Sequence, residues 1–226
     1  MKKYFLLLIL FLMLAWNRGY AQNSNNPIRD SLSRASEQLA YHPDSIDLRL
    51  KKASWNLMLE QWDYAHDDYD KVLNKDPQNI AALYYRAFVN EKQGRFNFAR
   101  LDYTNLLKLV PGNFEAQLGL ALLNQKDKHY TEAFDEINRL VEQFPDSAVA
   151  YAARAGIEKE RKMLELAEFD YTKAINKDGS NHDYILNRAD IRIQLGKFDD
   201  AKDDLDRLVK MGVPRASMKE YYMRIK

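Results

Sequence analysis

Helix-breaking residues recur along this chain at one fixed interval, and that interval constrains the fold more than any other feature. Proline stands at four positions spaced 34 residues apart, and glycine takes the fifth: Pro43, Pro77, Pro111, Pro145 and Gly179. Proline cannot continue a helix, and it pushes the residue before it out of the helical region. These positions are therefore predicted to separate structural units of equal length.

Four further columns repeat with the same interval. Two of them hold alanine in every unit: Ala53, Ala87, Ala121, Ala155 and Ala189, and Ala65, Ala99, Ala133, Ala167 and Ala201. Three residues before the second alanine comes a bulky residue: Trp62, Phe96, Tyr130, Leu164 and Phe198. Eight residues after it comes an apolar one: Leu73, Leu107, Val141, Ile175 and Val209. Because alanine lets two helix backbones approach closely, the columns predict helix hairpins that pack on their neighbours.

This pattern resembles the tetratricopeptide repeat, a helix-turn-helix unit with alanine, aromatic and closing proline positions. The resemblance covers residues 44–213 and implies five repeats: 44–77, 78–111, 112–145, 146–179 and 180–213. We therefore expect an all-α fold, an α-solenoid of about five helix hairpins. A linker and a capping helix are expected over 22–43, and a second capping helix over 214–226.

Residues 1–21 have the pattern of a secretory signal peptide. A basic start and a short apolar run, from Tyr4 to Trp16, precede small residues at Gly19 and Ala21. This run is shorter than the roughly 20 residues of a membrane-spanning helix. We expect cleavage after Ala21, no span in the mature chain, and a periplasmic or secreted protein; retention as an anchor is the alternative. The leader is similar to those of Gram-negative bacteria, particularly the Bacteroidetes.

A base and an acid also recur together. The residue before the first alanine is basic in four units and leucine in the third: Lys52, Arg86, Leu120, Arg154 and Arg188. An acid follows the second alanine by three residues in every unit: Asp68, Asp102, Glu136, Asp170 and Asp204. The column is either a row of cations facing a ligand or a set of ion pairs between helices. Because the charge is repeated in nearly every unit, we favour ion pairs, such as Arg86 with Asp102 or Arg154 with Asp170.

The sequence carries no pattern of catalytic residues. It has no cysteine, and its four histidines lack the spacing of a zinc-binding helix. It has no phosphate-binding glycine loop and no nucleophile elbow. The 34 basic and 33 acidic residues nearly cancel, so there is no electrostatic footprint for nucleic acid. We expect no enzyme activity, no cofactor, no metal and no small-molecule substrate.

The resemblance further implies that a partner peptide lies along the face formed by the first helices of the pairs. The main groove residues carried over from the family are Leu50, Leu57, Tyr84, Phe88, Leu118 and Leu122. The same family positions also give Ser54, Met58, Glu91, Gln125, Val149, Ala152, Gly156, Lys159, Asp183, Leu186 and Asp190. The N-terminal half of this groove is apolar and aromatic, which suits an extended or amphipathic segment, although Tyr84 and Phe88 could instead pack between helices. The expected function is a scaffold or adaptor of the cell envelope that binds a peptide segment of another protein. The alternative is a structural subunit of an outer-membrane or secretion assembly that docks through its ends.

Overall fold

The computed structural model describes residues 26–225, and all regular structure in that range is helical. The chain divides into two compact units, Met1–Gly94 and Arg95–Lys226. The predicted signal peptide, residues 1–21, lies outside the described residues. Within 26–225, no helix is long and apolar enough to cross a membrane. The expectation of an all-α fold is confirmed.

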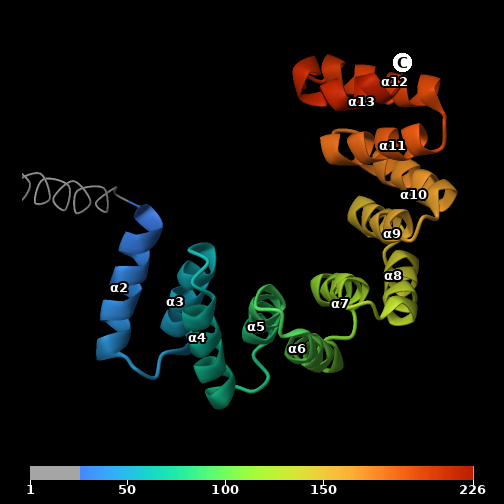
Figure 1. Ribbon diagram of the computed structural model, residues 1–226. Coiled ribbons are helices and arrows are strands. Elements are labelled where there is room, and N and C mark those ends of the chain that lie inside the picture. The colour runs from blue at the N-terminus through green and yellow to red at the C-terminus, as the bar shows by residue number, and fades with distance from the viewer. Residues whose placement is uncertain (1–25, 226) are drawn as a thin grey trace, which may run out of the picture. The chain divides into compact units, whose positions relative to one another are not determined.

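The first unit contains four helices after Asn26 (Figure 1). They are α2 (Pro27–Tyr41), α3 (Ile46–Met58), α4 (Trp62–Lys75) and α5 (Ile80–Lys92). The Asn26 side chain accepts a hydrogen bond from the Ile28 backbone N–H, and Pro27 occupies the first helical position, where no backbone donor is needed. Helix α2 packs against α3, and α3 packs closely against α4. A helix thus precedes the first repeat and covers its first helix.

The second unit contains seven helices of about four turns and a short C-terminal segment (Figure 1). The long helices are α6 (Phe96–Leu109), α7 (Phe114–Lys126), α8 (Tyr130–Gln143), α9 (Ala148–Glu160), α10 (Leu164–Lys177), α11 (His182–Gln194) and α12 (Phe198–Lys210). The 3-10 helix η1 (Arg215–Met218) and α13 (Lys219–Arg224) follow. The closest pairs are α7 with α8, α9 with α10, and α11 with α12. Each pair is one repeat, since a short turn joins its two helices.

A capping side chain begins the first helix of every repeat. In each case a serine or asparagine oxygen accepts a hydrogen bond from a backbone N–H in the first turn. These caps are Ser45, Asn79, Asn113, Ser147 and Asn181. Each stands two residues after the helix breaker that closes the preceding unit, so breaker and cap together fix where the next helix starts.

The turn inside each repeat holds one residue in the left-handed backbone conformation. These residues follow the same interval as the prolines: Glu60, Gly94, Lys128, Lys162 and Gly196, with φ between 56° and 74°. Glycine reaches this conformation without strain, whereas side chains with a Cβ do not. Two repeats therefore make the turn with glycine, and three make it with a strained residue.

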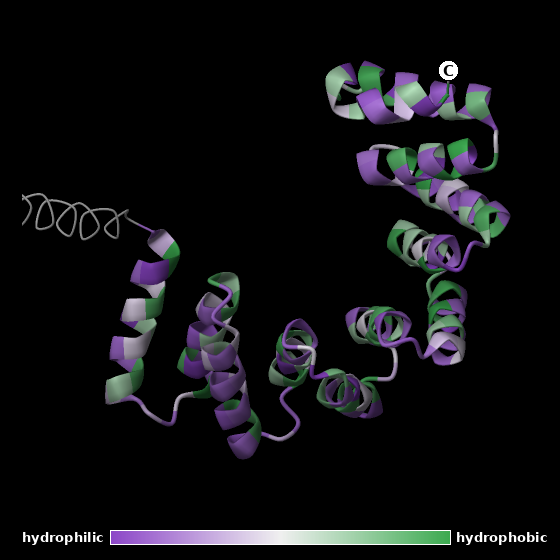
Figure 2. Ribbon diagram, viewed as in Figure 1, coloured by the Kyte–Doolittle hydropathy of each residue, from purple (hydrophilic) through white to green (hydrophobic). Residues whose placement is uncertain are grey.

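The alanine columns lie in the core. All ten alanines at the two repeat positions have no exposed surface. Figure 2 shows hydrophobic and hydrophilic residues mixed along each helix, as expected where every helix has one buried and one solvated face. Each repeat therefore buries its apolar surface against its neighbours.

The C-terminal segment covers the last repeat with two short helices rather than one. Met218 has φ −108° and ψ 16°, outside the α region, so η1 and α13 meet at this residue. This geometry buries Met218 and Tyr222 against Ile185, Leu205 and Leu208. Tyr222 is thus part of the core rather than of an exposed end.

Candidate functional site

A pocket of about 760 Å³ opens in the second unit on the first helices of three successive repeats, α7, α9 and α11. Its volume is typical of ligand-binding clefts. The three helices present matching faces because each occupies the same position within its repeat. Repetition of the hairpin therefore builds a continuous lining from residues far apart in the sequence.

The floor of the pocket is apolar and partly open to solvent. Leu122 and Val149 are 43% and 44% exposed, which is high for side chains of this size. Ala152, Ala153 and Gly156 also line the pocket, and their small size leaves room in it. A Cβ built on Gly156 would meet no heavy atom closer than 3.9 Å. The floor can thus accept apolar side chains from another molecule.

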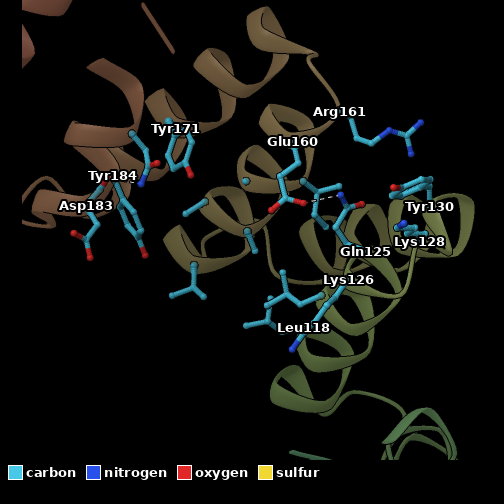
Figure 3. Close-up of a pocket in the computed structure, with 17 residues that line it drawn as sticks. Leu118, Gln125, Lys126, Lys128, Tyr130, Glu160, Arg161, Tyr171, Asp183 and Tyr184 are labelled. Carbon is cyan, nitrogen blue, oxygen red and sulfur yellow. Dashed lines mark hydrogen bonds between the residues drawn. The ribbon is translucent and has the colours of Figure 1, made fainter. Parts of the chain in front are cut away.

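A buried amide stands in the middle of the pocket. Gln125 is only 9% exposed, and its Nε2 donates a hydrogen bond of 2.8 Å to the Glu160 carboxylate (Figure 3). Its Oε1 has no hydrogen-bond partner among the described residues. A buried acceptor without a donor is costly, so this atom favours a ligand that brings an N–H group.

Charges of opposite sign stand on the two sides of the pocket. Figure 3 shows Lys128, Tyr130 and Arg161 on one side, and Asp183 and Tyr184 on the other. The Arg161 guanidinium lies 4.3 Å from the centre of the Tyr130 ring, which holds it in place. The pocket can therefore orient a bound segment by its charges as well as by its apolar contacts.

Two tyrosines of the pocket, Tyr171 and Tyr184, have raised pKa values. Burial, with the nearby Tyr184, Asp183 and Glu160, raises the pKa of Tyr171 to about 12. Burial also raises the pKa of Tyr184, with Asp178 and Asp183 contributing. Both phenols stay protonated at neutral pH and can donate hydrogen bonds. Across residues 26–225, no group of three or more acidic or histidine side chains is placed to hold a metal ion.

The predicted groove residues fall in different places. Leu118 and Leu122 line this pocket, as do Gln125, Val149, Ala152, Gly156 and Asp183. Lys159, Leu186 and Asp190 do not line it: Lys159 Nζ lies 2.9 Å from an Asp190 carboxylate oxygen, and Leu186 packs against the core of the last repeat. Leu50, Leu57, Tyr84 and Phe88 belong to the first unit and are partly buried there. Whether any of them binds a partner stays a prediction.

Tyr84 and Phe88 pack against aromatic rings of their own unit. The Phe88 ring meets Trp62 edge to face, with the ring centres 6.3 Å apart. The Tyr84 ring meets Tyr85 edge to face at 5.2 Å. The Phe88 contact joins α5 to α4, whereas the Tyr84 contact lies within α5.

Four lining residues lie outside the first helices of the repeats, where the family pattern did not indicate them. Tyr130 and Tyr171 belong to the second helices α8 and α10, whereas Lys128 and Arg161 lie just beyond the ends of α7 and α9. For Lys128 and Arg161 the sequence offered one indication. Each follows closely on a groove-lining helix, and a residue at that place is close enough to reach the rim of the groove.

The charged column forms ion pairs. Arg154 binds Asp170 with an Nε–Oδ2 distance of 2.5 Å, as predicted, and Lys52 Nζ lies 2.6 Å from an Asp68 carboxylate oxygen. Arg188 binds Asp204 in the same way. Arg86 and Asp102 belong to different units, so their pairing stays a prediction. The column is therefore structural in the repeats where it can be followed.

Comparison with known proteins gives the same fold. Residues 90–148 match the family model of the tetratricopeptide repeat. A segment of 52 residues is 38% identical to the Hsp70-Hsp90 organizing protein of Triticum aestivum, covering 23% of this chain but only 9% of that protein.

Solved structures match over most of the chain. A tetratricopeptide repeat protein from Parabacteroides merdae superposes with a TM-score of 0.71 at 22% identity, over 92% of this chain and 82% of that one. A thermophilic tetratricopeptide protein from Thermus thermophilus gives 0.62 at 16% identity, over 80% and 99%. YrrB, a tetratricopeptide protein with an unusual peptide-binding site, gives 0.56 at 16% identity, over 78% and 91%. The chain therefore has the all-α solenoid fold of tetratricopeptide proteins, and residues 90–148 also match the family by sequence.

Proposed function

We propose that this protein is a scaffold or adaptor of the cell envelope that holds a peptide segment of a partner protein in the pocket on α7, α9 and α11. The observation that carries this proposal is the combination in one place of an exposed apolar floor and a buried acceptor, Gln125 Oε1. The tetratricopeptide fold generally serves protein or peptide binding without catalysis, and YrrB has a peptide-binding site on the same fold.

The chemistry of the pocket suits a polypeptide. Apolar side chains of the bound segment cover Leu122 and Val149. A backbone N–H of the segment pairs with Gln125 Oε1 once the Gln125 amide turns toward the pocket, since this atom has no accessible surface in the free protein. Both contacts gain from burial, since one removes apolar surface from water and the other pairs an acceptor that has lost its water. The opposite charges on the two sides then fix the direction of the segment.

The envelope location rests on the sequence pattern of residues 1–21. Its test is fractionation of the source cells, followed by N-terminal sequencing of the protein. We expect a mature chain that begins at Gln22 in the periplasmic or secreted fraction. A chain that keeps residues 1–21 and sediments with membranes would contradict cleavage.

Docking through the ends of the stack is the second candidate, and the C-terminal end lends it little support. Met218 and Tyr222 are buried in the last repeat, which leaves Met223 as the exposed large apolar residue of α13. A permanent assembly interface usually needs a larger apolar patch.

The groove proposal is tested by capture of the partner. A photoreactive amino acid at position 122 is expected to cross-link a protein from the native envelope, and Leu122→Asp with Val149→Asp is expected to abolish its capture. Leu166→Asp is the matched control, because Leu166 is equally exposed but lies outside the pocket. An unchanged partner list in the double variant, with helicity preserved, would refute the proposed groove.

A further inference from the structure

The arginines of the fourth and fifth repeats each join three helices. Arg154, on α9, donates to Asp170 on α10 and also to Asn138 on α8, with an Nη1–Oδ1 distance of 3.1 Å. Its partners thus stand 16 positions later and 16 positions earlier. The guanidinium occupies the junction between its own repeat and the second helix of the preceding one.

The fifth repeat shows the same arrangement. Arg188, on α11, donates to both Asp204 carboxylate oxygens, at 3.0 and 2.6 Å, and to the Thr172 hydroxyl at 3.1 Å. Asp204 and Thr172 again stand 16 positions later and earlier. The fourth and fifth repeats therefore place a guanidinium at the same junction.

The third repeat has the junction without the arginine. Leu120 stands in that column, and the corresponding later and earlier partners are Glu136 and Thr104. A pocket of about 350 Å³ lies between α6, α7 and α8, and all three residues line it. The space that a guanidinium fills in the next two repeats is thus a pocket here.

The polar groups of this pocket are suited to a donor. Gln117, on α7, is 5% exposed, and its Nε2 donates to the Pro111 carbonyl at 2.7 Å and to Gln143 Oε1 at 2.8 Å. Within the described part of the chain its Oε1 has no hydrogen-bond partner. Gln117 Oε1 itself has no accessible surface, so the acceptors open to a ligand are the Glu136 carboxylate, 21% exposed, and the Thr104 hydroxyl. A guanidinium has five N–H donors and no acceptor, and its plane matches a carboxylate.

We propose that the pocket formed by α6, α7 and α8 binds an arginine side chain of a partner polypeptide, with its guanidinium in the position that Arg154 and Arg188 occupy in the following repeats. The aliphatic part of that side chain packs on Leu107 and Leu120, which also line the pocket. This pocket shares no lining residue with the one on α7, α9 and α11, so the proposal does not depend on the proposed function.

Two cations stand at the rim and oppose the ligand. Arg139 Nη1 lies 3.7 Å from Glu136 Oε1, and Lys108 Nζ donates to Asn105 Oδ1 at 3.3 Å. The Arg139 side chain is 59% exposed, so its attraction to Glu136 is weak and solvent-screened. An entering guanidinium with better geometry displaces it, and removal of the Arg139 charge is expected to strengthen binding.

The experiment is a titration of the mature protein with N-acetyl-arginine amide, followed by amide chemical shifts. We expect weak saturable binding, with the shifts confined to residues 104–120 and 136–143. The citrulline analogue, which has the same shape without the charge, is expected to give no saturable shifts. Leu120→Arg supplies an internal guanidinium and should weaken binding at least about tenfold. Leu101→Arg is the matched control, because Leu101 is exposed on α6 outside the pocket. The affinity of this variant for N-acetyl-arginine amide should stay within about twofold of wild type.

Two further variants keep the test decisive if Leu120→Arg fails to fold. Glu136→Gln should weaken binding about tenfold, and Arg139→Gln should strengthen it. The proposal is overturned if the citrulline analogue binds equally well. It is also overturned if Leu120→Arg leaves binding unaffected. Should Leu120→Arg not fold, unchanged binding by Glu136→Gln overturns it instead. Tighter binding of free arginine than of the blocked amide would overturn the assignment to a polypeptide.

Discussion

Arg154 on α9 holds the Asp170 carboxylate on α10 with two hydrogen bonds, from Nε at 2.5 Å and from Nη2 at 3.0 Å. Asp170 is 1% exposed, so water cannot take the place of this partner. The hydrogen bond to Asp170 raises the pKa of Arg154 above its already high value. The pair ties the two helices of the fourth repeat together, and the bond to Asn138 extends the link to the third.

Removal of the arginine alone should be strongly destabilising. Arg154→Leu leaves the Asp170 carboxylate buried without its partner, and we expect the free energy of unfolding to fall by about 3–5 kcal/mol. The double variant with Asp170→Asn should recover most of this loss, because no uncompensated charge remains. Urea unfolding followed by circular dichroism measures both. Equal stability of the single and double variants would contradict a role for charge burial.

Substitution by alanine should change the stability of the protein in opposite directions at Gly119 and at Gly156. A Cβ on Gly119 would lie 2.7 Å from the Tyr103 ring, and that ring is buried. Gly119→Ala must therefore push Tyr103 aside, and we expect a loss of about 1–3 kcal/mol, less the small gain in helix propensity.

Gly156→Ala is the matched variant, because Gly156 also lies inside a helix but has room for a methyl group. It should stabilise the protein by about 0.5–1 kcal/mol. Thermal melts of the two variants provide the comparison. A melting temperature that rises in both would show that the close approach of Tyr103 carries no strain.

Glu158 should make stability depend on pH near neutrality. It is buried, and desolvation, reinforced by Asp170 and opposed by Arg154, raises its pKa to about 7 from a usual value of 4.5. Between these values the folded protein keeps a proton that the unfolded chain has released. Stability therefore falls as pH rises from about 4.5 to about 7, and the cost is complete above that range.

Glu158→Gln removes this cost. We expect the variant to be about 1–3 kcal/mol more stable than wild type at pH 8, and nearly equal to it at pH 4.5. Glu165→Gln is the control, because Glu165 is exposed on α10. Three other repeats already carry a neutral amide in the column of Glu158: Asn56, Asn90 and Asn124. If the stability of Glu158→Gln and of wild type changed with pH in parallel, Glu158 would be excluded as the source of the pH dependence.

Lys162 holds the left-handed turn position between α9 and α10, with φ 61°, where two other repeats have Gly94 and Gly196. Glycine at position 162 removes the backbone strain of Lys162, and this gain outweighs the added freedom of the unfolded chain. Lys162→Gly should therefore stabilise the folded protein by about 0.5–1 kcal/mol. Lys173→Gly, inside α10, should destabilise by about 1 kcal/mol. Chemical denaturation of the two variants tests whether Lys162 is strained. If both variants lose stability, it is not.

The sequence alone determined the hairpins and their pairing. Proline and glycine at a constant interval mark the ends of the units, and the alanine columns mark where the helices touch. Both are local properties, because each repeat is one hairpin whose breaker, turn and close contact are encoded within a single unit. The pairing of Arg154 with Asp170 followed for the same reason, since the two residues lie on the two helices of one hairpin.

The tertiary structure decided which of the repeated positions became sites. Leu118 and Leu122 line a pocket because small residues follow at Ala152 and Gly156 one repeat later, whereas Phe88 meets Trp62. The pocket beside Leu120 likewise depends on Thr104 and Glu136 from two other helices. A repeat period fixes where each backbone runs, but the space between helices depends on the size and charge of side chains that neighbouring repeats bring together. That packing is set by the three-dimensional stack, and the period does not encode it.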